Sequence, residues 1–126
     1  MARAQCLGQL GSVSLQWLQD GLRDGADETE LREKLDEAVN YYEQALVLDP
    51  PDAITNLART HNQLGIAYGF SPTEQRKSIE HFKNAIGYFD RAGEWFESAG
   101  ARLSVAQILL RQEPDSRKLG SMRGKR

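Results

Sequence analysis

Histidine, cysteine and paired carboxylates build most catalytic and metal sites, and this sequence offers few arrangements of them. His61 and His81 are its only histidines. Neither belongs to a His-Glu-x-x-His pattern or to a cysteine-paired pattern, so their spacing does not favour a metal site. We expect His61 to be a packed, hydrogen-bonded interior residue and His81 to lie on a solvated helix surface.

Cys6 is the only cysteine, which excludes an internal disulfide and fits a reducing, cytoplasmic compartment. No His or Asn partner is recognisable in its sequence context, which favours an inert core thiol over a nucleophile. The glycines of "GQLG" at residues 8–11 follow no strand and lie within a helical pattern, so they do not predict a phosphate-binding loop. The sequence therefore predicts no enzyme, no cofactor and no metal.

Composition and charge narrow the class of protein further. The 126 residues are 40% hydrophobic and 27% charged, as in one soluble globular domain, and no apolar run reaches the roughly 18 residues of a membrane span. The first 116 residues carry 11 basic and 18 acidic side chains, a net charge of -7, whereas the last ten carry five basic and no acidic ones. An acidic body argues against nucleic acid as the main ligand. We expect residues 113–126 to form a basic, disordered tail.

Apolar residues recur every three or four positions along five segments, and no strand-like alternation interrupts them. The N-terminal segment does not have the continuous apolar run of a secretory signal. The sequence thus predicts an all-α fold of five helices joined by short loops. We expect the first helix to end before a loop with Gly21 and Gly25, the third to cover Ala53 to Tyr68, and the fifth to run from about Trp95 to Pro114.

Capping residues mark several of the expected helix ends. Asp27 stands where its side chain can cap the second helix, and Asp52 is placed in the same way before the third. Ser71 followed by Pro72 predicts that the fourth helix starts at Pro72, because the missing N–H of proline is harmless at the first helical position. Gly93 is placed to end this helix in a left-handed conformation.

A repeated pattern connects these helices. Leu64-Gly65, Tyr68, Phe82 and Ala85 recur at set offsets, and the stretch "LDEAVNYYEQALVLDP" carries Ala38, Tyr42, Ala45 and Pro50 at the matching places. The chain thereby resembles the tetratricopeptide repeat, a helix hairpin of 34 residues. Gly11 fits a first copy with about fifteen extra residues between its helices, and Gly100 fits a third, half copy. The motif also resembles bacterial arrays that accompany signalling or effector modules.

The resemblance implies an α-solenoid of antiparallel helix hairpins over residues 1–112, with about two and a half repeats. It also implies that Gly65, with Ala85 across from it, lets two helices approach closely. In such a fold the front helices line a concave groove that binds a peptide or partner protein. By register, the groove residues are Gln5, Gln9 and Ser12, then Arg59, Asn62, Gln63 and Ile66, then Glu94, Glu97 and Ala101.

These groove residues are mostly polar, which bears on the ligand. The family's carboxylate-binding subset uses Lys and Asn at such positions, and here only Asn62 and Arg59 are of that kind, with acids in the third copy. The pattern does not favour a carboxylate clamp and suits a neutral or partly basic segment instead.

The end of the array presents a second candidate surface. The third copy has no back helix, so no partner within the chain is expected for the apolar residues Val105, Ile108, Leu109 and Leu110. The fifth helix could itself cover the end of the stack, this face could meet another molecule or a second copy, or the chain could be a piece of a longer array.

The sequence therefore predicts a non-catalytic, cytoplasmic adaptor or scaffold that binds protein or peptide, without a membrane segment. A regulatory or sensor segment of a larger signalling assembly, or a self-associating helical element, remains an alternative. A weaker third hypothesis is nucleic-acid contact through Arg123, Lys125 and Arg126, which a steep salt dependence would reveal.

Overall fold

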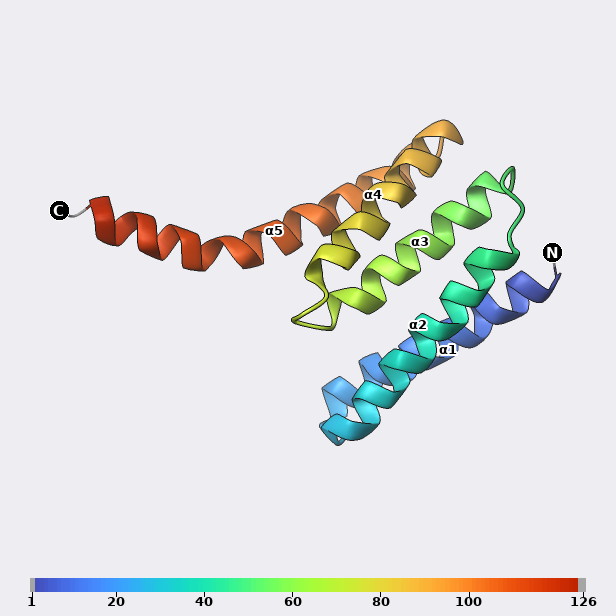
Figure 1. The fold of residues 1–126 in the computed structure, drawn as a ribbon, viewed down its shortest axis with the longest axis horizontal. Helices are drawn as coiled ribbons and strands as arrows, with labels where there is room; N and C mark the ends of the chain where they lie inside the picture. The colour runs from blue at the N-terminus through green and yellow to red at the C-terminus, as the bar shows by residue number, and fades with distance from the viewer. Residues whose placement is uncertain (1, 125–126) are drawn as a thin grey trace.

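The computed structural model describes the backbone of residues 2–124 and the side chains of residues 3–111, and over these residues it contains helices and connecting turns and no strand. Figure 1 shows the chain as five successive helices. Their bounds are α1 Ala2–Asp24, α2 Glu28–Leu48, α3 Ile54–Gly69, α4 Gln75–Arg91 and α5 Trp95–Gly124. The expected all-α fold of five helices is confirmed.

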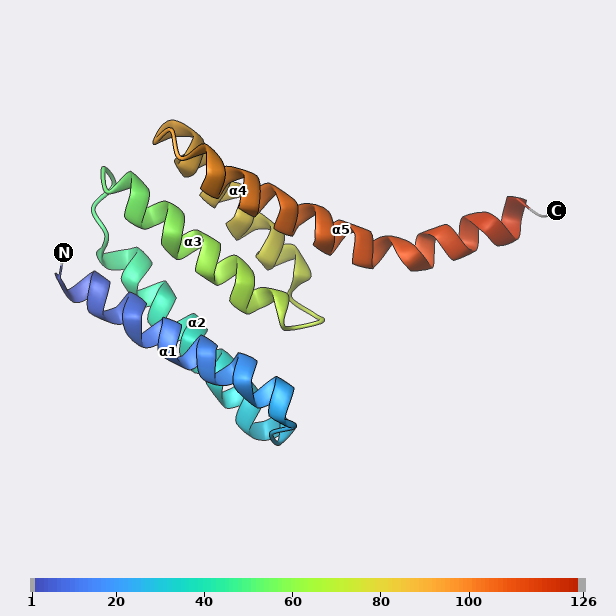
Figure 2. The ribbon, with the colours of Figure 1, turned by 180° about the vertical axis from the view of Figure 1, so that it is seen from behind.

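Neighbouring helices pack as antiparallel hairpins. α1 pairs with α2 and α3 pairs with α4, while α5 packs along α4 as the first helix of an incomplete third hairpin. Seen from behind, α1 and α5 lie toward the viewer at opposite sides of α3 (Figure 2). The stack is therefore two and a half hairpins, as expected from the sequence.

Helix ends agree with the capping signals only in part. Asp27 caps α2, because its carboxylate accepts a hydrogen bond from the Thr29 amide at 3.2 Å. Gly93 has φ of +73°, the left-handed conformation expected of it. Asp52, by contrast, does not cap α3, whose N-cap is Ala53.

Two predictions of helix ends, one based on Gly21 and one on Ser71 and Pro72, were wrong. Gly21 lies inside α1, not in a loop, and its α-carbon faces the Leu31 side chain of α2. Ser71 and Pro72 belong to a turn before α4, closed by a hydrogen bond from the Glu74 amide to the Ser71 carbonyl. Proline in the second position of such a turn has a suitable φ, so the same residue pair serves a turn as well as a helix start.

The expected end of the last helix at Pro114 is also wrong, because α5 continues to Gly124. A proline inside a helix removes one backbone hydrogen bond and usually kinks the helix, and α5 bends along its length (Figure 1). The basic side chains of the expected tail, Arg123, Lys125 and Arg126 among them, lie outside the described side chains.

In both complete hairpins a glycine of the first helix packs against an aromatic ring of the second. A Cβ added at Gly11 would lie 2.9 Å from ring atoms of Tyr42, and one added at Gly65 would lie 2.8 Å from ring atoms of Phe82. The sequence placed Ala85 opposite Gly65, but the residue across from this glycine is Phe82, one turn earlier on α4. The Ser78 hydroxyl of α4 also donates a 2.6 Å hydrogen bond to the Gly65 carbonyl of α3, at the same close approach of the two helices.

The apolar core follows the same order along the stack. One cluster joins the first hairpin to α3 through Leu18, Tyr42 and Leu64. Another joins α4 to α5 through Phe82, Ala101 and Ile108. The core is therefore a continuous layer between successive helices, and it leaves one side of α1, α3 and α5 free to form a surface.

Candidate functional site

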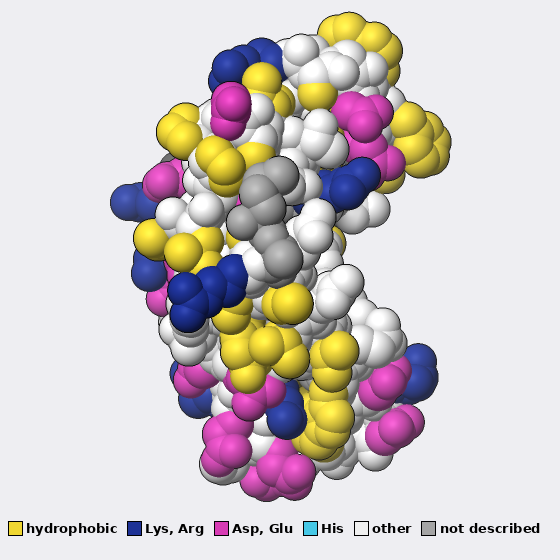
Figure 3. Space-filling view, turned by 90° about the vertical axis from the view of Figure 1, so that its right-hand side faces the viewer, with side chains coloured by type: hydrophobic (Ala, Val, Ile, Leu, Met, Phe, Trp, Pro, Cys, Tyr) yellow, Lys and Arg dark blue, Asp and Glu magenta, His cyan; other side chains and the backbone are white. Residues whose placement is uncertain are grey.

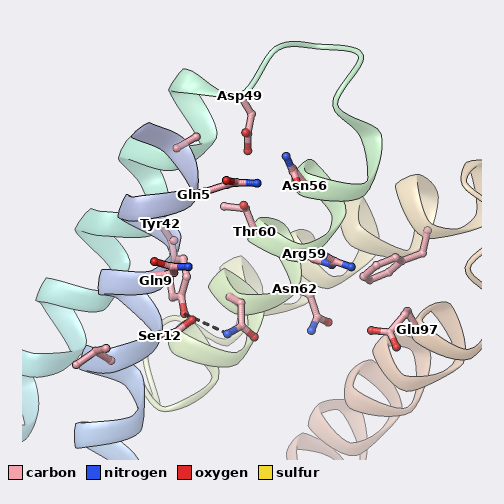
Figure 4. Close-up of a pocket in the computed structure, with 15 residues that line it drawn as sticks. Gln5, Gln9, Ser12, Tyr42, Asp49, Asn56, Arg59, Thr60, Asn62 and Glu97 are labelled. Atoms are coloured by element: carbon pink, nitrogen blue, oxygen red, sulfur yellow. Dashed lines mark hydrogen bonds between the residues drawn. The ribbon is translucent and has the colours of Figure 1, made fainter. Parts of the chain in front are cut away.

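The free sides of α1, α3 and α5 form a groove of about 800 Å³. In the space-filling view the body is a crescent with a notch on its concave edge (Figure 3). α1 forms one wall of the groove, α3 its floor and α5 the opposite wall (Figure 4). The groove is therefore built from one helix of each hairpin, although these helices are far apart in the sequence.

Seven of the ten groove residues expected from the sequence line this groove. They come from all three helices: Gln5, Gln9 and Ser12 on α1, Arg59, Asn62 and Gln63 on α3, and Glu97 on α5. Spacings of three or four residues place each set on one helical face. The side chains of Gln5 and Gln9 point from α1 toward α3 in Figure 4.

Three expected residues lie elsewhere. Ala101 is 2% exposed and packs between α4 and α5, so it cannot contact a ligand. Ile66 is partly buried against the two core clusters that flank α3. Glu94 is exposed just before α5 and does not line the groove. For the third copy, the prediction was therefore correct at Glu97 and wrong at Ala101, whose side chain points into the core and not into the groove.

Sequence reasoning missed five polar or aromatic residues of the groove. They are Tyr42, Asp49, Asn56, Thr60 and Phe89. Helical spacing could have revealed Asn56 and Thr60, because Asn56 lies three residues before Arg59 and four before Thr60. The other three lie on or next to back helices, and only the packing of the hairpins brings them to the groove.

Tyr42 connects the core to the groove wall. Its ring is 1% exposed, yet its hydroxyl lies 2.9 Å from the Ser12 hydroxyl and accepts a 3.1 Å hydrogen bond from the Gln63 amide. Burial raises the pKa of the Tyr42 hydroxyl, so it stays neutral and available as both donor and acceptor. This contact ties α1 to α3 at the base of the groove.

The groove carries few charges. Among the described residues that line it, Arg59 is the one base and Asp49 and Glu97 are the two acids, at its upper and right-hand edges in Figure 4. Burial raises the pKa of the Asp49 carboxyl. Most of the remaining lining groups are amides and hydroxyls, which donate and accept hydrogen bonds without a net charge.

The two histidines meet behind the groove, between α3 and α4. Their Nδ1 atoms lie 3.0 Å apart, and His61 is 9% exposed. The packed, hydrogen-bonded His61 is confirmed, whereas the solvated His81 is wrong, because His81 is half-buried between His61 and Tyr68. We name Tyr68, His81, His61 and Tyr88 the ring ladder, since each ring stacks on or tilts against the next at 5.2–5.7 Å between centroids.

Charged side chains surround the ring ladder. The Tyr68 hydroxyl donates a 3.1 Å hydrogen bond to Glu43 of α2. The Lys77 ammonium lies over the Tyr68 ring and the Arg91 guanidinium over the Tyr88 ring, each 5.5 Å from the ring centroid. Burial, reinforced by Glu43 and Glu74, raises the pKa of Tyr68 to about 12.

Both histidines resist protonation in this environment. Burial and then the neighbouring His81 lower the pKa of His61 to about 4. Burial also lowers the pKa of His81, with Lys77 adding to the effect and Glu43 and Glu80 opposing it. At neutral pH both rings are therefore uncharged.

The remaining candidates for chemistry stay apart from each other. Cys6 is exposed on α1, so the expected core thiol is wrong, because the stripe that packs on α2 passes through Ala4, Leu15 and Leu18 instead. Within the described residues no group of three or more His, Cys, Asp or Glu side chains is placed to hold a metal ion. None of the described helices is both long and apolar enough to cross a membrane.

The fold and the groove define an all-α protein of stacked helix hairpins with a polar concave surface. Comparison with models of known protein families, with curated proteins and with solved structures finds no match for this chain.

Proposed function

We propose that the chain is a tetratricopeptide-like interaction module that binds an extended peptide segment of a partner protein in its groove, without catalysis. The observation that carries this proposal is the convergence of seven separately expected residues from α1, α3 and α5 on one surface. The glycine-to-aromatic contact that recurs in both hairpins supports the family resemblance, because Gly11 and Gly65 hold the same place in the pattern.

The lining suggests the chemistry of the ligand. Gln5, Gln9, Asn56, Asn62 and Gln63 can each pair with the N–H and C=O groups of a peptide main chain. Arg59 offers one positive charge, whereas Asp49 and Glu97 offer two negative ones at the edges. We therefore favour a neutral or partly basic segment over an acidic one or a free carboxylate.

A variant with two substitutions on the groove floor, one of which reverses a charge, tests this function. We expect Arg59→Glu combined with Asn62→Ala to reduce partner capture at least tenfold, because both side chains lie on the groove floor and central contacts dominate binding. Wild-type and variant chains would serve as baits in a lysate, and a peptide from any captured protein would then be titrated directly.

A matched control carries the same two chemical changes outside the groove. Arg32 and Asn40 are both exposed on α2 and absent from the groove lining, so Arg32→Glu with Asn40→Ala should bind like the wild type. Equal peptide affinity of the groove variant and this control would refute the groove as the binding site.

A second candidate function is self-association through α5, favoured by an uncovered apolar stripe. The stripe expected from the sequence was partly wrong: Ile108 is 3% exposed and Val105 packs beside it against α4, whereas Leu109 and Leu110 are indeed exposed. Among the described side chains of α5, the large apolar ones that are exposed are Trp95, Phe96, Leu103, Leu109 and Leu110. Phe96, Leu103 and Leu110 follow one another at intervals of seven residues, so they lie on one face of α5, away from the face that Ala101 and Ile108 pack against α4.

Sedimentation tests self-association through this stripe. If two copies cover each other's α5, the wild type should become dimeric as concentration rises, and Leu103→Glu should remain monomeric, because a buried unpaired carboxylate is strongly unfavourable. Leu103 is 59% exposed, so the substitution should not disturb the monomer. A wild type that stays monomeric at high concentration rules out this candidate.

A further inference from the structure

The His61–His81 contact accepts only a limited number of protons. In the neutral pair one Nδ1 carries a hydrogen and donates it to the lone pair of the other across 3.0 Å. A first proton can bind at the free Nε2 of the donor ring and leave this bridge intact. A second proton must occupy the accepting Nδ1, which leaves two N–H groups pointing at each other and no acceptor between them. The doubly charged pair therefore cannot keep its present geometry.

The surrounding charges indicate which ring takes the first proton. Glu43 of α2 and Glu80 of α4 favour a charge on His81, with Lys77 opposing, whereas His61 faces His81 and Tyr88 with Arg91 beyond it. We therefore assign His81 as the donor and His61 as the acceptor. The rings of the ladder belong to α3 and α4, and the hydrogen bond from Tyr68 to Glu43 connects them to α2.

Residues of the ring ladder are direct neighbours, along the chain, of residues that line the groove. His61 stands between Thr60 and Asn62 on α3, and both of these line the groove. Tyr88, at the end of the ladder, is followed by Phe89, which also lines it. If α3 or α4 turns where the rings meet, Thr60, Asn62 and Phe89 turn with it, so a change in the packing of α3 on α4 would reach the groove floor.

We propose that the His61–His81 bridge is a pH-sensitive switch of the groove: acidification opens the bridge, moves α3 and changes the ligand-binding surface. The biological consequence, loss of a bound peptide at acidic pH, rests on the proposed function. The conformational step itself does not, because it occurs in the chain without ligand.

NMR titration of the unliganded full chain from pH 7.5 to 3 tests the switch, because the range must pass the pKa of His61 at about 4. We expect the side-chain amide signals of Asn62 and Gln63 to stay in place while His81 takes the first proton and to shift with the midpoint of the His61 ring, at about pH 4. The amide of Asn40, exposed on α2 and outside the groove, should not follow this midpoint.

A variant without the two imidazoles separates the switch from other titrations. His61→Phe with His81→Phe keeps aromatic rings in the ladder, so the shifts of Asn62 and Gln63 should be lost. If they persist, a groove carboxylate such as Asp49 causes them and the proposal is overturned. Should this variant not fold, the wild type decides alone: groove signals that stay fixed while the His61 ring titrates would also overturn the proposal. None of these results depends on whether the groove binds peptide.

Discussion

Gly65→Ala should lower the free energy of unfolding by about 2 kcal/mol, although alanine is the better helix former. A Cβ at this position would lie 2.8 Å from the root of the Phe82 ring. Phe82 is 2% exposed and packs against Ala101 and Ile108 of α5, so its ring has no space into which it could withdraw. The added methyl must therefore separate α3 from α4.

Urea denaturation of wild type and variant would measure this loss. Gly87→Ala on the exposed face of α4 is the matched control, because a Cβ there would meet no described atom within 4 Å. The control should gain about 0.5–1 kcal/mol from helix propensity alone. Equal and positive changes in both variants would show that the Gly65 contact with Phe82 is not tight.

Stability should also fall steeply between pH 6.5 and pH 4. His61 has a folded-state pKa of about 4 and an unfolded value near 6.5, so the unfolded chain binds this proton first. The contribution is complete above pH 6.5 and is lost as the pH falls toward 4. From this shift alone we expect a loss of about 2 kcal/mol by pH 5.

Denaturant midpoints at several pH values would measure the slope, and His61→Asn is its control. Asparagine can still hydrogen-bond to His81 but does not titrate, so the variant should lose less stability between pH 7 and pH 5. Glu37 is a separate contribution: the hydrogen bond from Ser14 lowers its pKa, and the stability it adds is lost only below pH 4.5. An identical slope in variant and wild type would exclude His61 as its source.

The sequence predicted those groove residues that share one face of a single helix. Gln5, Gln9 and Ser12 share a face because of their spacing, as do Arg59, Asn62 and Gln63, and the register of the repeat that the chain resembles indicated that these faces line a groove. Ala101 was misplaced because one residue changes the direction of a helical side chain by about 100°, and only packing on α4 fixes how α5 is turned.

The sequence by itself determined the helices, their order and the repeating hairpin, because apolar periodicity, prolines and small residues act over a few neighbouring positions. Tertiary structure alone decided which ring fills the space at Gly65, that Tyr42 reaches the groove from a back helix, and that His61 and His81 meet. These contacts join residues 17 to 30 positions apart, and their partners are set by the rotation and depth at which two helices pack, which local spacing does not specify.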